Sequence, residues 1–504
     1  MIDRSRRLPL RTKLAFSAGS LEEAVVGAAG IATMLFYNQV LGLSASLCGV
    51  VFLIASIVDG ISDPIVGAFS DQFKSRWGRR HPLMFLSAFP LAISFYCMYQ
   101  PPDDLSETGL FTWFLLFMIL MRIAKTFYTV PHAALGAELT EDYHERTSIF
   151  GYSAVVGMVG SVGFGVFLLV ALFPSTPEFS NGLLDENRYS LLAAFGAVTI
   201  VVTLFLCTFG TRDQIPYLHQ LPPRKFRVRE YLGELWQLLC NRSYLSVCAS
   251  WLVLATSIGI LGMVSTYTYI YAFEISTEQL TIQRFVTLPG ILAAIPLSAY
   301  LTKRFDKKWT VIYSSIVCAI LLGLPHVLRL IDFFPDNNSP WLLVALFGPM
   351  FLAYLVAPLL PIVIDSQLVD ITDDHEHRTG HRSEGVVFSI RTFAMKATSG
   401  LGGLIGGFGL DLIAFPKQAV VGEVAPEALN GLLFMSGPLY WLIVAAAIGF
   451  MTMYQLSESR HAQILTELRA RRARSAKSDF QDQAQIGVVP GDATFTDTEQ
   501  PSRR

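Results

Sequence analysis

Two aspartates lie four residues apart inside an apolar stretch of the chain, in the segment SIVDGISDP at residues 56–64. If the stretch is an α-helix, this spacing places the carboxylates of Asp59 and Asp63 on one face. The stretch runs from about residue 47 to residue 69, which is long enough to cross a bilayer. A carboxylate at that depth costs about 2.5–3.5 kcal/mol on insertion scales. The pair therefore predicts a site for a positive charge.

The atoms around the two aspartates suit a small cation. Pro64 has no N–H, so the carbonyl of Gly60 lacks its helical donor. This carbonyl, the hydroxyl of Ser62 and the two carboxylates form a set of oxygen ligands, which hard cations prefer. We predict that Na⁺ or H⁺ binds at Asp59 and Asp63, and we expect no other metal or cofactor.

Two other apolar stretches carry ionisable residues at a similar depth. At about 1.5 Å of helix per residue, Asp59 lies roughly 20 Å, Lys396 roughly 17 Å and Glu23 roughly 15 Å from one end of its stretch. Such groups converge on a central cavity, where they can pair with one another or with a bound ion. We therefore expect Lys396 to be the charge partner of Asp59 and Asp63. A permanent ion-pair lock among these three residues, with no moving ion, is the alternative.

Further basic residues lie inside predicted spans. Arg122 and Lys125 are three residues apart, which places them on one helix face. They can pair with Glu22 or Glu23 for packing alone, or they can hold an anionic group of a solute. Arg391 is a similar candidate.

The composition is that of a membrane protein. Of the 504 residues, 52% are hydrophobic and only 15% are charged, whereas soluble globular chains carry about 25% charged residues. The six cysteines show no metal-ligand spacing, and the sequence has no nucleotide-binding or nucleophilic-triad motif. We therefore expect a protein of the lipid bilayer that is neither an enzyme nor a partner of nucleic acid.

Apolar stretches long enough to cross a bilayer occur twelve times. Their approximate bounds are 14–41, 46–70, 83–101, 109–136, 148–173, 189–210, 245–273, 280–302, 309–330, 340–364, 385–412 and 430–455. The connections between them alternate between basic and acidic, and the positive-inside rule places the basic ones and both termini in the cytoplasm. We predict an all-α polytopic membrane protein of a bacterial inner (plasma) membrane.

The longest connection, residues 211–244, divides the spans into two six-helix halves. The predicted units are the N-terminal half 1–210, this cytoplasmic linker, the C-terminal half 245–455, and a cytoplasmic tail 456–504 that starts as an amphipathic basic helix and is then disordered. Residues 64–71 and 295–301 show a weak sequence similarity, and each segment is followed by a basic loop. This suggests that the halves are related by duplication. Two pseudo-symmetric halves around a midplane site are typical of major facilitator transporters.

The basic loop after the second span has residues suited to a conformational latch. Asp71 ends the span, and Arg76, Arg79 and Arg80 follow it. Arg79 and Arg80 can reach the C-termini of neighbouring helices, whose dipoles favour cations. The simpler interpretation is that the loop is basic only because it lies on the cytoplasmic side, and both can hold together.

Five features of the sequence form a set. They are the segment FYNQVLGL at residues 36–43, the aspartate motif at 59–64, Asp71, the loop RWGRRHP at 76–82 and the span-eleven lysine, Lys396. Together they resemble the glycoside–pentoside–hexuronide:cation symporter family, the melibiose-permease-like branch of the major facilitator superfamily, over nearly all twelve spans. The resemblance implies that Asp59 and Asp63 bind the coupling Na⁺, Li⁺ or H⁺, with Thr126 in the same site and Lys396 beside it.

The residues that would hold a sugar in that family are absent at the matching positions. In that family the sugar is held by an acid in span one, an acid in span four and an arginine in span five. The matching positions in this chain are Ala24, Thr129 and a position near Ala154. A related animal branch moves lysophospholipids with Na⁺ through the same acids and lysine. The resemblance therefore implies the cation site and leaves the solute open.

These observations predict a secondary active transporter that carries a sugar, glycoside or uronide together with Na⁺ or H⁺ by alternating access. The candidates for solute binding are Glu23, Arg122, Lys125, Thr129 and Arg391. A carrier of lysophospholipid or of another amphipathic or anionic solute is the alternative, and a transporter-like sensor that moves nothing is a third hypothesis. The expected partners are a small solute, the coupling cation and the lipid bilayer, and we expect a monomer.

Overall fold

Every regular element in the described part of the chain is a helix. The computed structural model describes residues 7–140, 142–218, 228–380 and 384–485. The first helices are α1 (Leu10–Ala18), α2 (Leu21–Leu35), α3 (Ala45–Gln72), α4 (His81–Met98), α5 (Glu107–Glu138), α6 (Tyr143–Phe167) and α7 (Asn187–Gly210). They are followed by α8 (Val228–Leu239), α9 (Arg242–Tyr267), α10 (Thr277–Val286), α11 (Leu288–Leu330), α12 (Leu342–Val356), α13 (Leu359–Thr379), α14 (Glu384–Leu412), α15 (Pro426–Phe434), α16 (Tyr440–Thr452) and α17 (Glu458–Gln485). Single π-helical turns extend α2, α6, α9 and α15, namely η1 (Phe36–Val40), η2 (Leu168–Leu172), η5 (Thr268–Ala272) and η6 (Met435–Leu439).

Helices cover each of the twelve predicted spans. Within the described residues, ten helices are long and apolar enough to cross a membrane. The two remaining predicted spans correspond to α14 and to α10 with the first part of α11. Predicted spans eight and nine are continuous in α11 except at Asp306, whose φ of 63° is not helical. The predicted all-α polytopic fold is confirmed.

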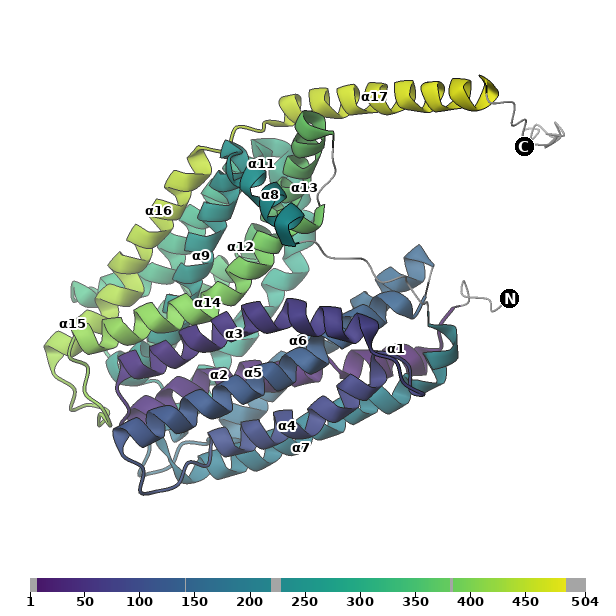
Figure 1. The fold of residues 1–504 in the computed structure, drawn as a ribbon. Helices are drawn as coiled ribbons and strands as arrows, with labels where there is room; N and C mark the ends of the chain where they lie inside the picture. The colour runs from purple at the N-terminus through teal and green to yellow at the C-terminus, as the bar shows by residue number, and fades with distance from the viewer. Residues whose placement is uncertain (1–6, 141, 219–227, 381–383, 486–504) are drawn as a thin grey trace, which may run out of the picture.

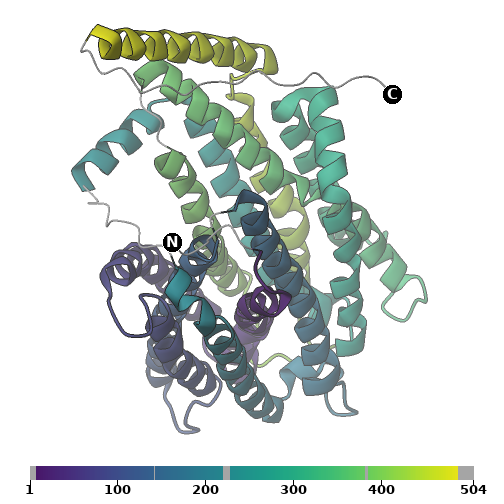
Figure 2. The same ribbon diagram turned by 90° about the vertical axis from the view of Figure 1, so that its right-hand side faces the viewer.

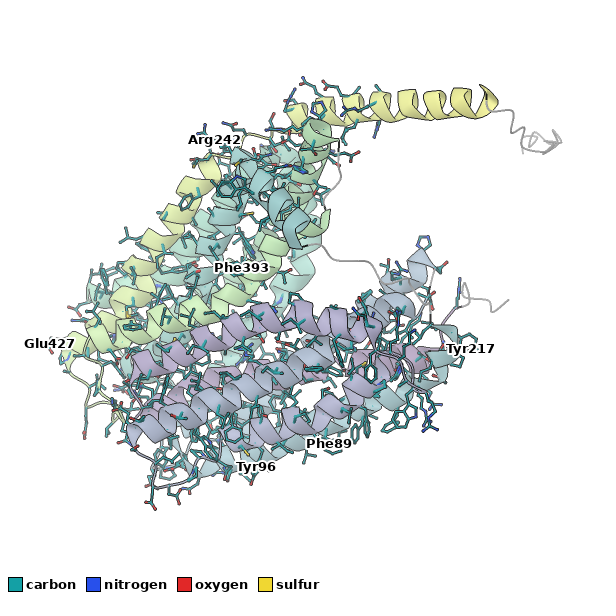
Figure 3. All side chains as sticks on the ribbon, in the orientation of Figure 1. Phe89, Tyr96, Tyr217, Arg242, Phe393 and Glu427 are labelled. Carbon is teal, nitrogen blue, oxygen red and sulfur yellow. The ribbon has the colours of Figure 1, made fainter. Side chains whose placement is uncertain are left out.

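Two bundles of helices form a wedge (Figure 1). Helices α1–α7 form one bundle and α9–α16 the other, and α3 of the first lies beside α14 of the second. The bundles meet at a narrow end and diverge toward a wide end; Figure 2 views the molecule from the wide end, with α17 across the top. Tyr217 and Arg242, on either side of the linker, lie at the two separated tips, whereas Glu427 lies at the narrow end (Figure 3).

Helix α14 packs closely against α3 on one side and α9 on the other because glycines line both contacts. A Cβ added at Gly407 would lie 2.2 Å from the carbonyl oxygen of Ala45 in α3, and one at Gly402 would lie 2.6 Å from the backbone of Gly259 in α9. Small residues of this kind let membrane helices approach each other. Because α14 is held against α3 in this way, its Lys396 comes within reach of the aspartates of the first bundle.

Side chains of the two bundles join at the narrow end. The hydroxyl of Tyr267 donates a hydrogen bond to Oδ1 of Asn38 (3.0 Å), and the hydroxyl of Tyr271 donates to Oε1 of Gln39 (2.9 Å). All four side chains are buried. Buried polar groups must be paired, so these contacts tie η1 of the first bundle to the end of α9 and η5 in the second.

A further contact at the narrow end involves a carboxylate. The N–H of Ser175 donates to Oε1 of Glu278 (2.8 Å), and its hydroxyl donates to Oε2 (2.6 Å). Partial burial tends to raise the pKa of Glu278, but the hydrogen bonds from Ser175 outweigh it and hold this pKa below its ordinary value. The contact joins the loop after η2 to the start of α10.

Candidate ion and solute site

The two aspartates of α3 face three basic and hydroxyl side chains from other helices. The Nη1 atom of Arg122 in α5 donates to Oδ2 of Asp59 (3.0 Å). The Nζ of Lys396 in α14 pairs with Oδ2 of Asp63 and also donates to the backbone carbonyl of Asp59 (3.0 Å). Lys396 therefore lies beside the two aspartates, where we predicted it. Of the two alternatives left open for Arg122, pairing with Glu22 or Glu23 is not found, since α5 brings it to Asp59.

Hydroxyl groups complete the oxygen atoms around Asp63. Thr126 Oγ1 donates to Oδ1 of Asp63 (3.1 Å), and Ser62 Oγ lies 3.1 Å from Thr126 Oγ1. A Cβ added at Gly60 would have no heavy atom within 4 Å, so this side of the helix is open. The side-chain oxygens of Asp63, Thr126 and Ser62 thus lie next to one another, and such a set of oxygen ligands suits a small hard cation.

The start of α2 contributes two glutamates with different surroundings. Glu23 pairs with Lys125 of α5 and its side chain is largely exposed. Glu22 is only 1% exposed, and its Oε1 has no hydrogen-bond partner among the described residues. The break between α1 and α2 positions both of them, and Gly19 at the break leaves room for the Tyr128 side chain, whose hydroxyl would lie 2.0 Å from a Cβ added there. The pairing of Glu23 with span four, which was one of the two alternatives, is present through Lys125.

A central cavity of about 870 Å³ lies between the two bundles. Both bundles line it, and the acidic, lysine and arginine residues of its lining in the described part of the chain are Glu23, Asp59, Asp63, Arg122, Lys125, Arg284 and Lys396. Three of them are carboxylates, and each is held by one cation: Asp59 by Arg122, Asp63 by Lys396 and Glu23 by Lys125. The candidate cation site therefore opens onto a cavity whose size suits a small solute.

The opposite wall of the cavity was missed by sequence reasoning. It comes from the second bundle and includes Arg284 of α10, Trp251 of α9 and His326 of α11. Tyr269 and Tyr354 are also part of it. The signal that could have found it is the same as for Lys396: Arg284 is a cation inside a predicted span, near its start at residue 280.

The positions expected for sugar-binding residues in the resembling family meet at a second cavity of about 480 Å³. Ala24, Thr129 and Ala154 all line it, together with Glu22. Thr129 and Glu23 line both cavities. Arg391 lies in α14, but its side chain is outside the described residues.

The loop for which we predict a latch makes its ion pairs inside the first bundle. Arg80 pairs with Asp71 at the end of α3 (2.5 Å) and with Glu138 at the end of α5 (2.8 Å), and Arg79 also pairs with Glu138 (3.0 Å). Arg76 is exposed. These contacts fix the wide ends of α3 and α5 to each other, and a role of the loop in gating stays a prediction.

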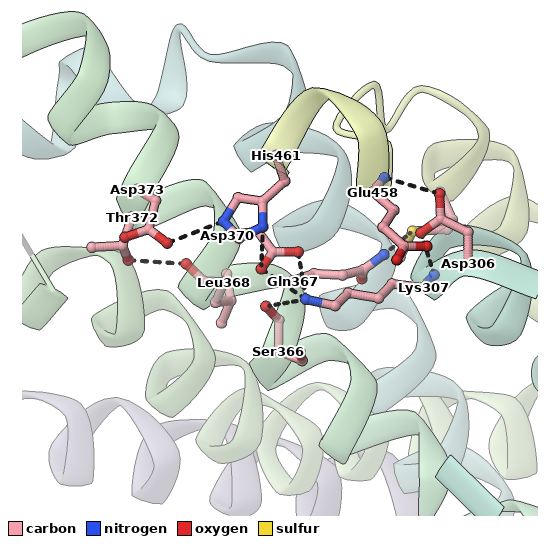
Figure 4. Close-up of polar contacts among 11 residues, drawn as sticks. Asp306, Lys307, Ser366, Gln367, Leu368, Asp370, Thr372, Asp373, Glu458 and His461 are labelled. Carbon is pink, nitrogen blue, oxygen red and sulfur yellow. Dashed lines mark hydrogen bonds and ion pairs between the residues drawn. The ribbon is translucent and has the colours of Figure 1, made fainter. Parts of the chain in front are cut away.

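The second bundle has its own ion-pair cluster at the wide end (Figure 4). Lys307 of α11 donates to both carboxylate oxygens of Asp370 in α13 (2.7 and 2.6 Å), and His461 of α17 contacts Asp373 (3.0 Å). Ile464, which is also in α17, has a buried side chain. Helix α17, which contains the helix predicted for the tail, is thereby anchored to α13.

Comparison with known proteins identifies the family. A family model described as MFS/sugar transport protein matches residues 16–458. The chain belongs to this family of transport proteins. The predicted major facilitator membership is confirmed, and with it a multi-pass protein of the bacterial inner membrane.

Relatives match over nearly their whole length. An uncharacterized symporter, YjmB of Bacillus subtilis, is 24% identical over 93% of this chain and 97% of its own. The putative glycoside/cation symporter YagG of Escherichia coli is 25% identical over 93% and 96%. A putative sulfoquinovose importer of Salmonella typhimurium is 25% identical over 92% and 94%. Among solved structures, the nucleoside transporter NupG matches with a TM-score of 0.60 at 14% identity, over 89% of this chain and 100% of its own, which supports the fold.

Proposed function

We propose that this protein is a symporter that couples the entry of a sugar or glycoside to Na⁺ or H⁺ bound at Asp59 and Asp63. The observation that carries the proposal is the bond between Lys396 and Asp63, because it joins the two bundles: Asp63 belongs to α3 and Lys396 to α14. A contact that joins the moving parts and also occupies the ion site is what coupling requires.

The coupling follows from competition for one carboxylate. Both aspartates are neutralised by protein cations, Asp59 by Arg122 and Asp63 by Lys396. A Na⁺ or H⁺ that binds Asp63 therefore replaces the Nζ of Lys396, and the freed lysine changes the contact between α3 and α14. A ligand shifts a conformational equilibrium by its differential affinity for the two states, so ion binding biases the position of one bundle relative to the other.

The wedge supports alternating access. Apart from the contacts of Lys396 with Asp59 and Asp63, the polar contacts between the bundles named here lie at the narrow end, which carries the acidic connections; the basic connections lie at the wide end. Under the positive-inside rule the cavity of this conformation opens to the cytoplasm. Rocking of the bundles around a midplane site would expose the cavity to the other side.

The cavity lining favours a sugar over a lipid. Trp251, Tyr269 and Tyr354 provide aromatic faces with polar ends, and charged groups surround them. Aromatic rings with a few well-placed polar groups are typical of small polar ligands. The name of one relative, a glycoside/cation symporter, agrees with this choice.

The test is ligand-dependent stabilisation of the purified protein in detergent, because ligands that bind the folded state raise its Tm. Methyl glycosides, hexuronates and lysophosphatidylcholine would each be added with and without Na⁺ and over a range of pH. A sugar that stabilises more strongly with Na⁺, or at a pH that protonates the site, supports the proposal. Stabilisation by lysophosphatidylcholine alone would show that the protein is a lipid carrier.

A further inference from the structure

A buried glutamate of the first bundle takes no part in the proposed cation site. Glu22 is the second residue of α2, it is only 1% exposed, and its Oε1 atom has no hydrogen-bond partner among the described residues. Its side chain lines the second cavity, which shares Glu23 and Thr129 with the central one. An ionised carboxylate that is buried without a partner is costly. Glu22 therefore requires either a cation or a proton.

The cations near Glu22 are held by other carboxylates. Apart from Arg284 on the opposite wall, the acidic, lysine and arginine residues that line the two cavities in the described part of the chain are Glu22, Glu23, Asp59, Asp63, Arg122, Lys125 and Lys396. Each of the three cations is bonded to one of the other three carboxylates. The charged groups that act on Glu22 are Glu23 of its own helix and two of these cations, Arg122 and Lys125 of α5. One negative charge is therefore left over, and it lies on Glu22.

The other ionisable side chains around Glu22 are held by different contacts. His132 of α5 stacks on Phe16 of α1, with ring centroids 4.2 Å apart, and its Nε2 donates to the carbonyl of Phe16 (3.0 Å). The thiol of Cys207 in α7 donates to the same carbonyl (3.6 Å). The hydroxyl of Tyr128 belongs to a residue of the cavity lining and, like Oε1 of Glu22, has no hydrogen-bond partner among the described residues. None of these described side chains forms an ion pair with Glu22.

The second cavity is suited to carry a proton to Glu22. Its lining includes four aliphatic hydroxyl residues, Thr129, Ser161, Ser153 and Ser20. The hydroxyl oxygens of the last two lie 2.5 Å apart. A polar cavity of about 480 Å³ has room for several water molecules, each of which takes about 30 Å³, and waters pass protons along hydrogen bonds. A metal ion needs several oxygen ligands around it, and the buried Oε1 of Glu22 leaves no space for such a shell, so a proton is the better fit.

We propose that Glu22 binds a proton during transport, at a site separate from the cation site of Asp59 and Asp63. Lys125 controls this site, because it pairs with Glu23 in the present conformation and leaves Glu22 to the proton. Glu23 also lines the central cavity, where a solute that hydrogen-bonds to its carboxylate competes with Lys125. The released ammonium attracts Glu22 as a carboxylate, and the proton of Glu22 passes to water in the second cavity. The inference rests on the proposed symport and adds a second ion to it.

The experiment detects the protonated carboxyl group in the full-length protein. Infrared difference spectra between neutral and alkaline pH are recorded for the protein in lipid bilayers at a fixed Na⁺ concentration. The wild-type protein is expected to show the C=O band of a protonated carboxyl group at neutral pH, and Glu22→Gln is expected to lack it. Glu23→Gln is expected to lose the same band, because Lys125 is then free to keep Glu22 ionised. Glu186→Gln is the matched control and should keep the band, since this exposed glutamate lines neither cavity.

A second measurement tests whether the two ion sites are separate. The rise in Tm on addition of Na⁺ is compared between the wild-type protein and Glu22→Gln, because a ligand that binds the folded state raises its Tm. If Glu22 lies outside the cation site, the rise should be equal in the two proteins. It should be lost in Asp63→Asn.

The outcomes separate the inference from the proposed function. A wild-type spectrum without the band, or a band that survives in Glu22→Gln, overturns the inference and leaves symport standing. A band that survives in Glu23→Gln overturns the control by Lys125. Loss of the Na⁺-dependent rise in Tm in Glu22→Gln places Glu22 in the cation site and overturns the inference as well. If no sugar stabilises the wild-type protein, the proposed symport fails, and the spectra still decide whether Glu22 binds a proton. If Glu22→Gln does not fold, Glu23→Gln decides, since it leaves Glu22 in place.

Discussion

The two walls of the central cavity differ in how their charges are satisfied. On the wall of the first bundle, Asp59 and Asp63 are already held by protein cations, one of them from the second bundle. On the opposite wall, Arg284 has no carboxylate among the described residues. A paired site can exchange one cation for another, whereas an unpaired charge attracts a ligand of opposite sign. Under the proposed function, the first wall responds to the ion and the second contacts the solute.

The largest effect is expected on the ion-responsive wall. Asp63→Asn leaves Lys396 without its carboxylate; removing one partner of a fully buried pair costs about 3–5 kcal/mol, and less in this pair, whose side chains are 24% and 32% exposed. Cation-dependent uptake of the bound sugar should fall by more than about 100-fold. The measurement is radiolabelled uptake by proteoliposomes under a Na⁺ or proton gradient, with Asp104→Asn, an exposed acid in a loop, as control.

A double variant tests whether this loss comes from the ion site or from the stranded lysine. Asp63→Asn with Lys396→Ala removes both charges, so the Tm should recover most of the stability lost in the single variant. Cation-dependent uptake should not recover. Its return in the double variant would contradict the assignment of Asp63 to the ion.

A smaller effect is expected on the solute wall. Trp251→Phe keeps the aromatic face and removes the indole N–H, which the structure leaves without a partner. Solute affinity should fall by about three- to tenfold, as for one hydrogen bond, and the dependence on Na⁺ or pH should stay as in the wild type. Calorimetric titration at two cation concentrations measures both quantities. A change in cation dependence alone would mean that the walls are not distinct in function.

Removal of a hydrogen bond that joins the two bundles at the narrow end should have a milder effect. Tyr267→Phe removes the hydrogen bond to Asn38, worth about 1 kcal/mol. The population of conformations open at the narrow end should then rise by about fivefold. Distances between spin labels placed at the narrow end would report the shift. An unchanged distance distribution would show that this bond does not hold the bundles closed.

The smallest effect is expected at Glu278, which joins α10 to the loop after η2 through Ser175. Its pKa in the folded protein lies below the ordinary value of 4.5, despite the opposing effect of burial. A carboxylate with a lowered pKa stabilises the fold above that value and loses this contribution as the pH falls through the folded-state pKa. Glu278→Gln should therefore lower the Tm slightly at neutral pH, and the difference from the wild type should vanish under acid conditions. Thermal unfolding over a pH series measures it.

The site could be predicted in part because ionisable residues inside apolar spans are rare and costly. Asp59, Asp63 and Lys396 stand out for that reason, and the structure brings them together. The same reasoning applied to Arg284 would have singled it out, but it lies near a predicted span boundary, where a cation attracts less notice. His326 and Trp251 could not be found in this way, since only their surroundings show that their ring nitrogens lack a partner.

The sequence by itself determined the all-helical polytopic fold, the family and the residues of the candidate cation site. A helix that crosses a bilayer needs about twenty consecutive apolar residues, so each span can be recognised directly in the sequence. Only the tertiary structure decided which charge pairs with which. The spacing within one helix sets the face on which a side chain lies, but the partner depends on which helices meet and how closely. The glycines of α14 and the angle between the bundles determine that Arg122 contacts Asp59 and that Lys396 reaches Asp63.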